Sequence, residues 1–364
     1  MDLISIKESC THFQGVVSDI LKQYKYFNFE VVPCGEDGLT MSIARKILVE
    51  LGPNIERLSL PRNRFAKIGV NILKLIPGYC LHLTELEILY FPMNAKTLKS
   101  LQEVLKSLNI LKLIDCNIGD SIEETLIAAN HLSNLDLSYN NQMTGKCLRA
   151  IRNIQSLNLE GCTEIQEQSF CTFLSNNRAL KHLNIKYCYR LAGTSMESIA
   201  QNMSELTSLV CSYQPRANFA LIAKLTKLRR ISLHILEWSI DSLLIELSGC
   251  NSIECIELED DVLFGVDYAL IQKMTNLKEL YLNYKMDFGD EQLAILSQKD
   301  NFRQLHIVGC IHITENQLVE FIGRNPLLET LDISYCQVTD KLLFAVIEML
   351  EKKKLMQAMC PPSR

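Results

Sequence analysis

One nine-residue pattern recurs along most of this 364-residue chain and restricts what it can fold into. Its clearest copy, residues 180–188, reads Leu-Lys-His-Leu-Asn-Ile-Lys-Tyr-Cys. The pattern is an apolar residue, two free positions, a second apolar residue, one free position, a third apolar residue, two free positions, then Cys or Asn. Twelve copies can be counted; the others start at Leu108, Leu132, Ile154, Phe302 and Leu328, and, with weaker matches, at Ile55, Leu83, Leu206, Leu228, Ile253 and Leu277.

The second apolar residue of each copy serves as a reference position, and the copies are numbered from one to twelve by it. These residues are Leu58, Leu86, Leu111, Leu135, Leu157, Leu183, Leu209, Ile231, Ile256, Leu280, Leu305 and Leu331. Successive reference positions lie 22 to 28 residues apart. This period and pattern are typical of leucine-rich repeats, in which each unit is a short strand followed by a return helix. We expect an α/β leucine-rich-repeat solenoid, a horseshoe with parallel strands inside and helices outside.

Three segments are expected along the chain: a non-repeating segment at 1–32, the array of about twelve repeats at 33–352, and a tail at 353–364. Apolar residues at three- and four-residue steps predict a helix within 3–21. An aromatic and β-branched run predicts a strand at 24–32, and 39–51 reads as a helix that stops at Gly52 and Pro53.

Composition and charge exclude several classes of protein. The formal net charge of −5 lacks the basic footprint of nucleic-acid binding, so no nucleic-acid partner is expected. No apolar run reaches the roughly 18 residues of a membrane-spanning helix, so no membrane association is expected. The first residues do not form a secretory signal. We therefore expect the protein in the cytoplasm or the nucleus.

Several of the 14 cysteines share the last position of the pattern, which points inward just past the strand. They are Cys116, Cys162, Cys188, Cys310 and Cys336, while Asn63 and Asn140 hold this inward position in other copies. An asparagine there can hydrogen-bond the bending backbone, and a thiol can do so more weakly. Stacked copies would lie about 4.8 Å apart, which does not exclude disulfides, but we expect reduced, buried thiols.

No catalytic spacing is present. The chain has no phosphate-binding Gly-rich loop, no His-Glu-x-x-His and no Gly-x-Ser-x-Gly, and its seven histidines are scattered. Without Cys-x-x-Cys, zinc lacks its usual pair of ligands. We expect no enzymatic activity, no cofactor and no metal.

The repeat geometry predicts a binding surface instead, because side chains alternate along a strand and the free positions face outward. The residues that we expect to contact a protein substrate on the concave face are His182, Lys186, Arg230, His234, Glu257, Glu259, Tyr281 and Asn283. Basic residues at 181–190 and 224–230 precede an acidic run at 254–261. These charges could orient a protein ligand, or neighbouring copies could pair them along the sheet.

Two further features are open to two interpretations. Tyrosine recurs just before the inward position, where it favours ring packing between copies but is also typical of binding hot spots. These residues are Tyr90, Tyr139, Tyr187, Tyr213, Tyr284 and Tyr335. Copies seven to ten are irregular at the inward position, where they carry Gln214, Leu236, Asp261 and Lys285. This irregularity is typical of sequence drift, and a functional insertion is the alternative. Two 22-residue periods, Leu135 to Leu157 and Leu209 to Ile231, predict shortened returns.

Residues 2–17, Asp-Leu-Ile-Ser-Ile-Lys-Glu-Ser-Cys-Thr-His-Phe-Gln-Gly-Val-Val, resemble the second half of an F-box, in which a Leu-rich helix leads into a Cys-x-x-Phe step. The array resembles the cysteine-containing leucine-rich repeats of F-box proteins. The family's opening segment, with Leu-Pro and acidic residues, does not precede residue 2 in this sequence. The resemblance implies a partial helix that binds the Skp-family adaptor through Leu3, Ile6, Cys10 and Phe13; the alternative is a helix that only caps the first repeat.

The function implied by the resemblance is that of a substrate-recognition subunit of a Skp-cullin-F-box ubiquitin ligase, with the adaptor and cullin complex as partners. A stand-alone scaffold or inhibitor is the alternative. A GTPase-activating repeat protein is a more remote third interpretation.

Overall fold

The computed structural model describes residues 14–33, 38–212, 218–235, 241–259, 266–282 and 287–359. Contacts among residues divide the chain into two compact units, Met1–Met203 and Ser204–Arg364. The array expected at 33–352 therefore extends over both units, and each unit has its own strands and return helices.

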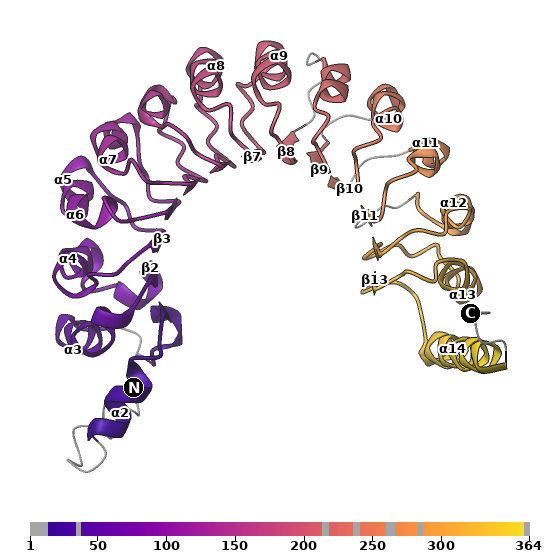
Figure 1. Cartoon of the computed structure of the whole chain (residues 1–364), viewed down its shortest axis with the longest axis horizontal. Helices are drawn as coiled ribbons and strands as arrows, with labels where there is room; N and C mark the ends of the chain where they lie inside the picture. The colour runs from indigo at the N-terminus through magenta and orange to yellow at the C-terminus, as the bar shows by residue number, and fades with distance from the viewer. Residues whose placement is uncertain are drawn as a thin grey trace. The chain divides into compact units, whose positions relative to one another are not determined.

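Unit 1 alternates strands with helical returns, and its strands pair in parallel in chain order. The strands are β1 (Tyr26–Asn28), β2 (Arg57–Pro61), β3 (Glu85–Leu89), β4 (Ile110–Ile114), β5 (Asn134–Asp136), β6 (Ser156–Asn158) and β7 (His182–Ile185). The α-helices are α2 (Gln14–Leu21), α3 (Met41–Leu51), α4 (Ile76–Tyr79), α5 (Ala95–Lys99), α6 (Gln102–Leu105), α7 (Glu123–Ala128), α8 (Glu167–Asn176) and α9 (Gly193–Asn202). The 3-10 helices are η2 (Phe29–Val31), η3 (Gly52–Asn54), η4 (Arg62–Phe65), η5 (Gly69–Lys74), η6 (Asp120–Ile122) and η7 (Lys146–Ala150). Helices α3 to α9 lie on one side of the strands (Figure 1).

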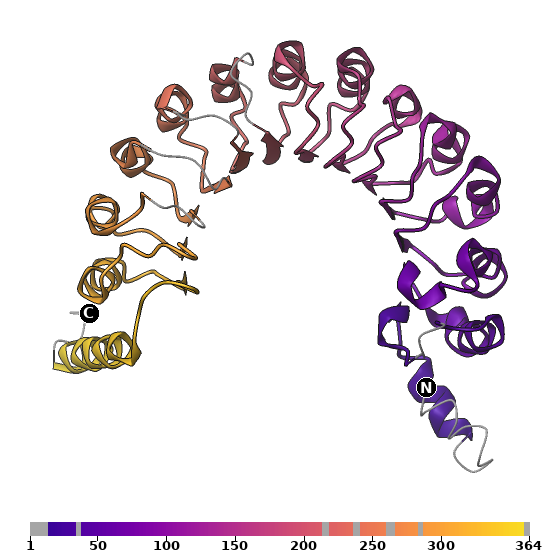
Figure 2. The same ribbon diagram turned by 180° about the vertical axis from the view of Figure 1, so that it is seen from behind.

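Unit 2 repeats the arrangement, with parallel strands in chain order. The strands are β8 (Ser208–Ser212), β9 (Arg230–His234), β10 (Cys255–Glu259), β11 (Glu279–Tyr281), β12 (Gln304–His306) and β13 (Thr330–Asp332). The returns are η8 (Phe219–Lys224), α10 (Asp241–Ser248), α11 (Tyr268–Lys273), α12 (Asp290–Leu296), α13 (Glu315–Arg324) and α14 (Asp340–Met359). They lie together on one side of the strands (Figure 2).

The reference positions define the pairing register. Within unit 1 each reference leucine from Leu58 to Leu183 pairs with the next, and within unit 2 the same holds from Leu209 to Leu331. All are buried except Leu331, in the last copy, which is half-buried. The predicted register of the reference positions is therefore confirmed.

The two shortest periods contain 3-10 helices where longer copies have α-helices. The return between Leu135 and Leu157 is η7, and the return between Leu209 and Ile231 is η8. A 3-10 turn uses fewer residues than an α-turn, so it fits a 22-residue copy. The prediction of shortened returns is confirmed.

The inward position forms a ladder of hydrogen bonds from one copy to the preceding one. The Cys162 thiol donates to the Leu137 carbonyl at 3.1 Å, and the Cys188 thiol donates to the Leu159 carbonyl at 3.0 Å. The side chains of Cys116, Cys310 and Cys336 reach the equivalent carbonyls at 3.4, 3.5 and 3.1 Å. These five cysteines are free thiols, as predicted. Burial raises the pKa of Cys116 and of Cys162 to about 12.

The inward role predicted for Asn63 is wrong. Asn63 is exposed, and its amide donates to the Glu30 carboxylate at 3.2 Å. Because η4 turns the chain directly after β2, Phe65 rather than Asn63 reaches the interior. Its ring centroid lies 5.0 Å from that of Phe29 and 5.9 Å from that of Phe91, so phenylalanines begin the buried row.

Short polar side chains lie at or next to the last residue of several strands. The Oδ1 atoms of Asp136, Asn158, Asn184 and Asp332 each accept a hydrogen bond from the main-chain N–H two residues later, at 2.9 to 3.0 Å. Each lies directly after the reference position. Such a local side-chain acceptor competes with the sheet and turns the chain.

Carboxylates at the start of one return cap the next copy. Asp120 accepts hydrogen bonds from the Thr144 hydroxyl at 2.6 Å and from the main-chain N–H groups of Thr144, Gly145 and Cys147. Burial raises the pKa of the Asp120 carboxyl, but the hydrogen bonds from Thr144 and Cys147 outweigh this, so its pKa lies below the ordinary value.

Asp120→Ala should lower the free energy of unfolding by about 1 kcal/mol near neutral pH, because η7 loses its cap. Since the folded-state pKa is depressed, this contribution is present above the unfolded-state pKa and is lost as the pH falls through the folded-state pKa. The difference in thermal midpoint between wild type and variant should therefore shrink between pH 7 and pH 3. Asp120→Asn, which keeps an oxygen acceptor, should cost less. A difference that does not change with pH would contradict the capping role.

The ends of the array differ from expectation in detail. The strand expected at 24–32 is present as β1 followed by η2, and α2 covers the last part of the helix expected within 3–21. The helix expected at 39–51 begins at Met41, after the Thr40 cap, and ends at Leu51. Helix α14 continues to Met359, so the boundary expected at residue 352 falls within a helix.

Candidate functional site

The strand face of unit 2 carries an interconnected group of polar and aromatic side chains around Arg230. The Arg230 guanidinium lies 3.4 Å from the Glu279 carboxylate and 3.9 Å from the Glu257 carboxylate. It also lies 5.2 Å from the ring centroid of Tyr281. Burial lowers the pKa of Arg230, but interactions with Cys255, Tyr281 and Glu257 outweigh it, and the net pKa is raised. The group therefore holds a permanent cation between two carboxylates.

The same group continues to β12 and β13. The Tyr281 and His306 rings stack with centroids 4.3 Å apart, and the Tyr281 hydroxyl donates to the Gln304 side chain at 2.8 Å. His306 Nδ1 lies 3.5 Å from the Asp332 carboxylate. The hydrogen bond from Ser334 lowers the pKa of Asp332, so its carboxylate stays ionised. We call Arg230, Glu257, Glu279, Tyr281, His306 and Asp332 the strand-face network. Its charged and histidine side chains are 21% to 40% exposed, so they are held in place yet accessible to a partner.

The structure brings three of the eight predicted contact residues into this network: Arg230, Glu257 and Tyr281. His234 and Glu259 face each other in register at the ends of β9 and β10. Asn283 lies outside the described residues.

The other two predicted contact residues lie in unit 1. His182 is exposed at the start of β7, whereas Lys186 is 9% exposed and its ammonium lies 4.8 Å from the ring centroid of Tyr187. Their contact with a partner stays a prediction.

The sequence-based list omitted Glu279, Gln304, His306 and Asp332. Glu279 and Gln304 lie directly before the reference residue of their copies, as Arg230 does in copy eight. His306 and Asp332 lie directly after it, as Ser232 does in copy eight. Applying the outward positions to copies eleven and twelve would have found three of them.

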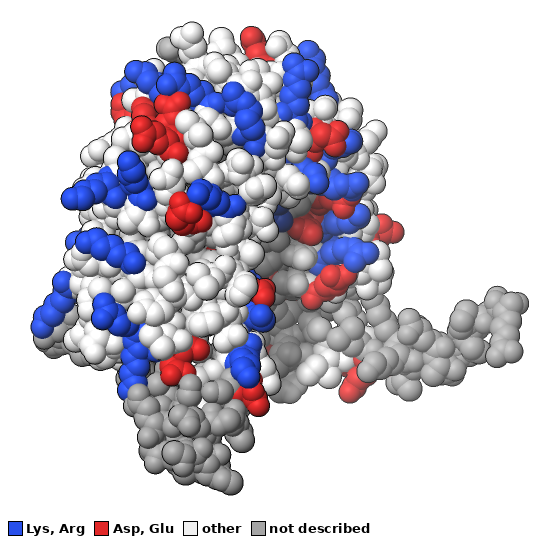
Figure 3. Space-filling model, turned by 60° about the vertical axis from the view of Figure 1, so that its left-hand side comes forward, with Lys and Arg blue, Asp and Glu red and all other residues white. Residues whose placement is uncertain are grey.

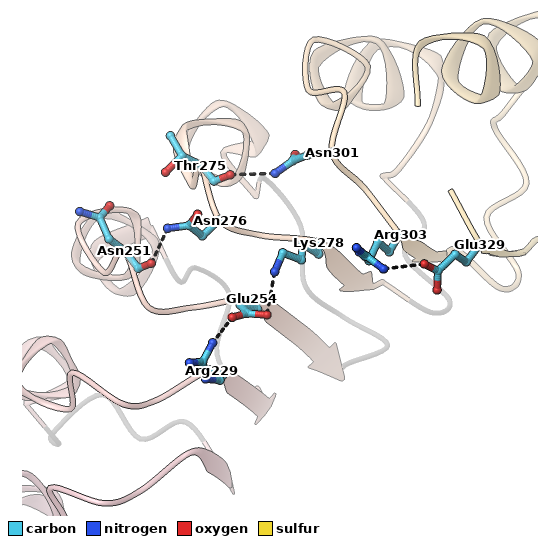
Figure 4. Close-up of polar contacts among 9 residues, drawn as sticks. All are labelled: Arg229, Asn251, Glu254, Thr275, Asn276, Lys278, Asn301, Arg303 and Glu329. Atoms are coloured by element: carbon cyan, nitrogen blue, oxygen red, sulfur yellow. Dashed lines mark hydrogen bonds and ion pairs between the residues drawn. The ribbon is translucent and has the colours of Figure 1, made fainter. Parts of the chain in front are cut away.

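Many charged side chains along unit 2 form ion pairs with side chains of a neighbouring copy. Arg229 and Lys278 both contact the Glu254 carboxylate, and Arg303 contacts Glu329 at 2.6 Å. Figure 4 shows this row of side chains at the amino ends of the strands, with Asn276 donating to the Asn251 carbonyl beside it. Lys and Arg side chains also lie beside Asp and Glu side chains on the face drawn in Figure 3. Each exposed pair is worth at most about 1 kcal/mol. These contacts favour the interpretation in which neighbouring copies pair their charges along the sheet over the one in which the charges orient a protein ligand.

The tyrosines before the inward position are more exposed than ring packing predicts. Tyr90 is 54% exposed, Tyr139 42% and Tyr335 80%, while Tyr187 is half-buried. Tyr213 and Tyr284 lie outside the described residues, as do the irregular positions Gln214, Leu236, Asp261 and Lys285.

An apolar groove of about 720 Å³ lies at the last copy, between α13, β13 and α14. It is lined by side chains that include Ile322, Leu328, Leu331, Leu342 and Val346. Among the described residues no further strand pairs with β13 beyond β12, which explains why Leu331 is only half-buried.

The predicted adaptor-binding residues Leu3, Ile6, Cys10 and Phe13 lie outside the described residues. Among the helices of the described residues, none is long and apolar enough to span a bilayer. Across the same part of the chain, no group of three or more His, Cys, Asp or Glu residues could hold a metal ion.

Comparison with known proteins gives distant relatives. No family model matches the chain. A Caenorhabditis elegans protein named "Putative RNA-binding protein EEED8.10" is 23% identical over 294 residues, which cover 70% of this chain and 40% of that protein. The chain thus matches less than half the length of this relative.

A solved structure shares the fold. A chain from the crystal structure of the yeast Rad7–Elc1 complex matches with a TM-score of 0.60 and 15% identity, covering 86% of this chain and 88% of that one. An internalin of Listeria monocytogenes matches with a TM-score of 0.47 and 16% identity, covering 87% of this chain and 96% of that one. With the parallel strands, the returning helices and the twelve-copy pattern, the chain is an α/β leucine-rich-repeat protein.

Proposed function

We propose that this chain binds a protein on the strand face of its repeats and serves as the substrate-recognition subunit of a Skp-cullin-F-box ubiquitin ligase. The strand-face network carries the binding part of this proposal. It combines an arginine, a tyrosine and ionised carboxylates on strands whose other side is packed against helices. Tyrosine and arginine are enriched where protein interfaces gain most of their affinity. Such a subunit performs no chemistry; it raises the local concentration of substrate lysines near a ubiquitin-charged enzyme.

Two observations support the ligase part. Residues 2–17 resemble the second half of an F-box, and Rad7, from the structure with the highest TM-score quoted above, was crystallised as a complex with Elc1. RNA binding, which the name of the C. elegans relative suggests for that protein, is disfavoured for this chain by its net charge of −5 and by the pairing of Arg229, Arg230 and Lys278 with carboxylates.

Titration of the purified chain with a Skp-family adaptor in a calorimeter tests the ligase part. We expect micromolar or tighter binding that is lost in Phe13→Asp. Tyr24→Asp is the matched control, because Tyr24 is an exposed aromatic residue just outside the F-box-like stretch, and it should bind as wild type does. Absence of binding, or binding that survives Phe13→Asp, would leave a stand-alone protein-binding module as the function.

Arg230→Gln should reduce recovery of the protein substrate, because the strand-face network loses the cation that holds Glu257 and Glu279. The measurement is quantitative mass spectrometry of proteins captured by wild type and by the variant. Lys273→Gln, the same charge change on the exposed side of α11, is the control. The same proteins recovered in equal amounts by both variants would exclude the strand-face network as the binding site.

A further inference from the structure

In copies two to six of unit 1 the residue immediately before the inward position has a left-handed backbone. The angle φ is 66° at Tyr90, 49° at Asp115, 61° at Tyr139, 69° at Gly161 and 62° at Tyr187. Glycine adopts this conformation without strain, whereas a bulky side chain there costs about 1 to 3 kcal/mol. Since Gly161 and Asp115 serve the same turn, the fold does not require the three tyrosines.

The first four of these positions continue the spacing of the strands, because each donates its main-chain N–H to the following copy. The bonds run from Tyr90 to Ile114, from Asp115 to Ser138, from Tyr139 to Glu160 and from Gly161 to Lys186, at 2.7 to 2.9 Å. Adjacent strands lie about 4.8 Å apart. The three tyrosines stand on every second copy, so they follow one another at about 9.6 Å.

Large and small residues alternate along this edge. A Cβ atom at Gly161 would lie 2.6 Å from Cδ1 of Tyr139, so the Tyr139 ring occupies the space that the glycine leaves. The Tyr139 hydroxyl donates to the Glu160 carboxylate at 2.5 Å, which holds the ring in place. Tyr187 lies beside Tyr189, with ring centroids 6.1 Å apart. The result is a row of oriented, partly exposed rings on every second copy.

We propose that this tyrosine edge, defined as Tyr90, Asp115, Tyr139, Gly161 and Tyr187, binds a proline-rich segment of a partner protein in the polyproline II conformation, with a basic residue opposite Asp115. A polyproline II helix rises about 3.1 Å per residue, so every third residue recurs after about 9.3 Å. That repeat is close to the tyrosine spacing of about 9.6 Å. Aromatic rows recognise such segments because the ligand loses little conformational entropy on binding.

The charged side chains at this edge favour a basic peptide over RNA as the ligand. Asp115 is exposed between Tyr90 and Tyr139, and Glu160 follows between Tyr139 and Tyr187. The Lys186 ammonium also lies here, 4.8 Å from the Tyr187 ring centroid, but two carboxylates against one ammonium leave this edge negative. A negative edge attracts a lysine or arginine and repels the phosphates of single-stranded RNA, whose bases could otherwise stack on tyrosines. A basic proline-rich peptide is therefore favoured over RNA. This site lies at the edge of unit 1, apart from the strand-face network, and does not depend on the ligase link.

Fluorescence anisotropy with the full chain tests the site. The probe is a labelled ten-residue peptide with proline at positions 2, 5 and 8 and arginine at position 4. Tyr90→Gly should weaken binding at least about tenfold, the effect of a hot-spot tyrosine, while leaving the thermal midpoint unchanged or higher because glycine relieves the left-handed backbone. Tyr335→Gly is the matched control: it has the same backbone, with φ of 60°, is 80% exposed and lies in unit 2, and it should not change binding.

Two further probes complete the experiment. A peptide of the same composition with its prolines respaced to 2, 4 and 7 should bind at least about tenfold more weakly. Asp115→Asn should weaken the arginine peptide but not an all-proline decamer. The proposal is overturned if the spaced peptide does not bind, if the respaced peptide binds equally well, or if Tyr335→Gly weakens binding as much as Tyr90→Gly. Tight binding of a uridine decamer with no peptide binding would assign the edge to RNA instead.

Discussion

Asn140→Leu should lower the free energy of unfolding of unit 1 by about 2 to 6 kcal/mol. Asn140 is fully buried, and its Oδ1 accepts the main-chain N–H groups of Cys116 and Ile118, both at 3.0 Å. Leucine has a similar volume but no acceptor, so both buried N–H groups would lose their partner. Each such loss costs about 1 to 3 kcal/mol. Urea unfolding followed by circular dichroism measures the difference.

Asn140→Cys tests the hydrogen bonds that the Asn140 side chain donates separately from those that it accepts. The Asn140 amide also donates to the Leu113 carbonyl at 2.7 Å, and a thiol can keep this bond, as Cys162 does with Leu137 in the next copy. The cysteine variant should therefore be more stable than the leucine variant and less stable than wild type. Equal stability of the leucine variant and wild type would show that the amide contributes nothing.

Leu183→Ala should cost about 2 to 5 kcal/mol through the cavity that it leaves. Leu183 is 1% exposed on β7, in register with Leu157 of the preceding strand. The denaturant midpoint should fall, with little change in the slope of the transition, if the variant keeps the same fold.

Two controls accompany this variant. Leu183→Met conserves most of the volume and should cost less than about 1.5 kcal/mol. Leu331→Ala removes the same side chain from the same repeat position in the last copy, where the leucine is only half-buried, and should cost less than Leu183→Ala. If both alanine variants unfold as wild type does, the reference leucines do not form the core.

The repeat pattern predicted most of the fold because each copy contacts mainly its neighbours, so a local period determines the register. It also predicted shortened returns in the two 22-residue copies, although not that these returns would be 3-10 helices. It failed at Asn63, because a 3-10 turn directly after β2 moved Phe65 into the inward position. The pattern counts residues and does not show such a turn.

The binding surface was less predictable than the fold. The outward positions of Arg230, Glu257 and Tyr281 followed from strand alternation, but their convergence depends on the side-chain conformations chosen across five strands. The stacking of Tyr281 on His306 is one contact that depends on these side-chain conformations. The tyrosine edge was visible as a recurrence of Tyr before the inward position, yet only the left-handed backbone shows that these rings are not required by the turn.

The strand-ending role of Asp136, Asn158, Asn184 and Asp332 limits how this surface can diversify in evolution. Each occupies the middle of the three outward positions of its copy, and its Oδ1 is engaged by the main chain of the same copy. Mutations there disturb the turn, and at Asp332 they also change the strand-face network. In these copies, new ligand specificity must therefore arise at the first and third outward positions, while the middle column stays Asp or Asn.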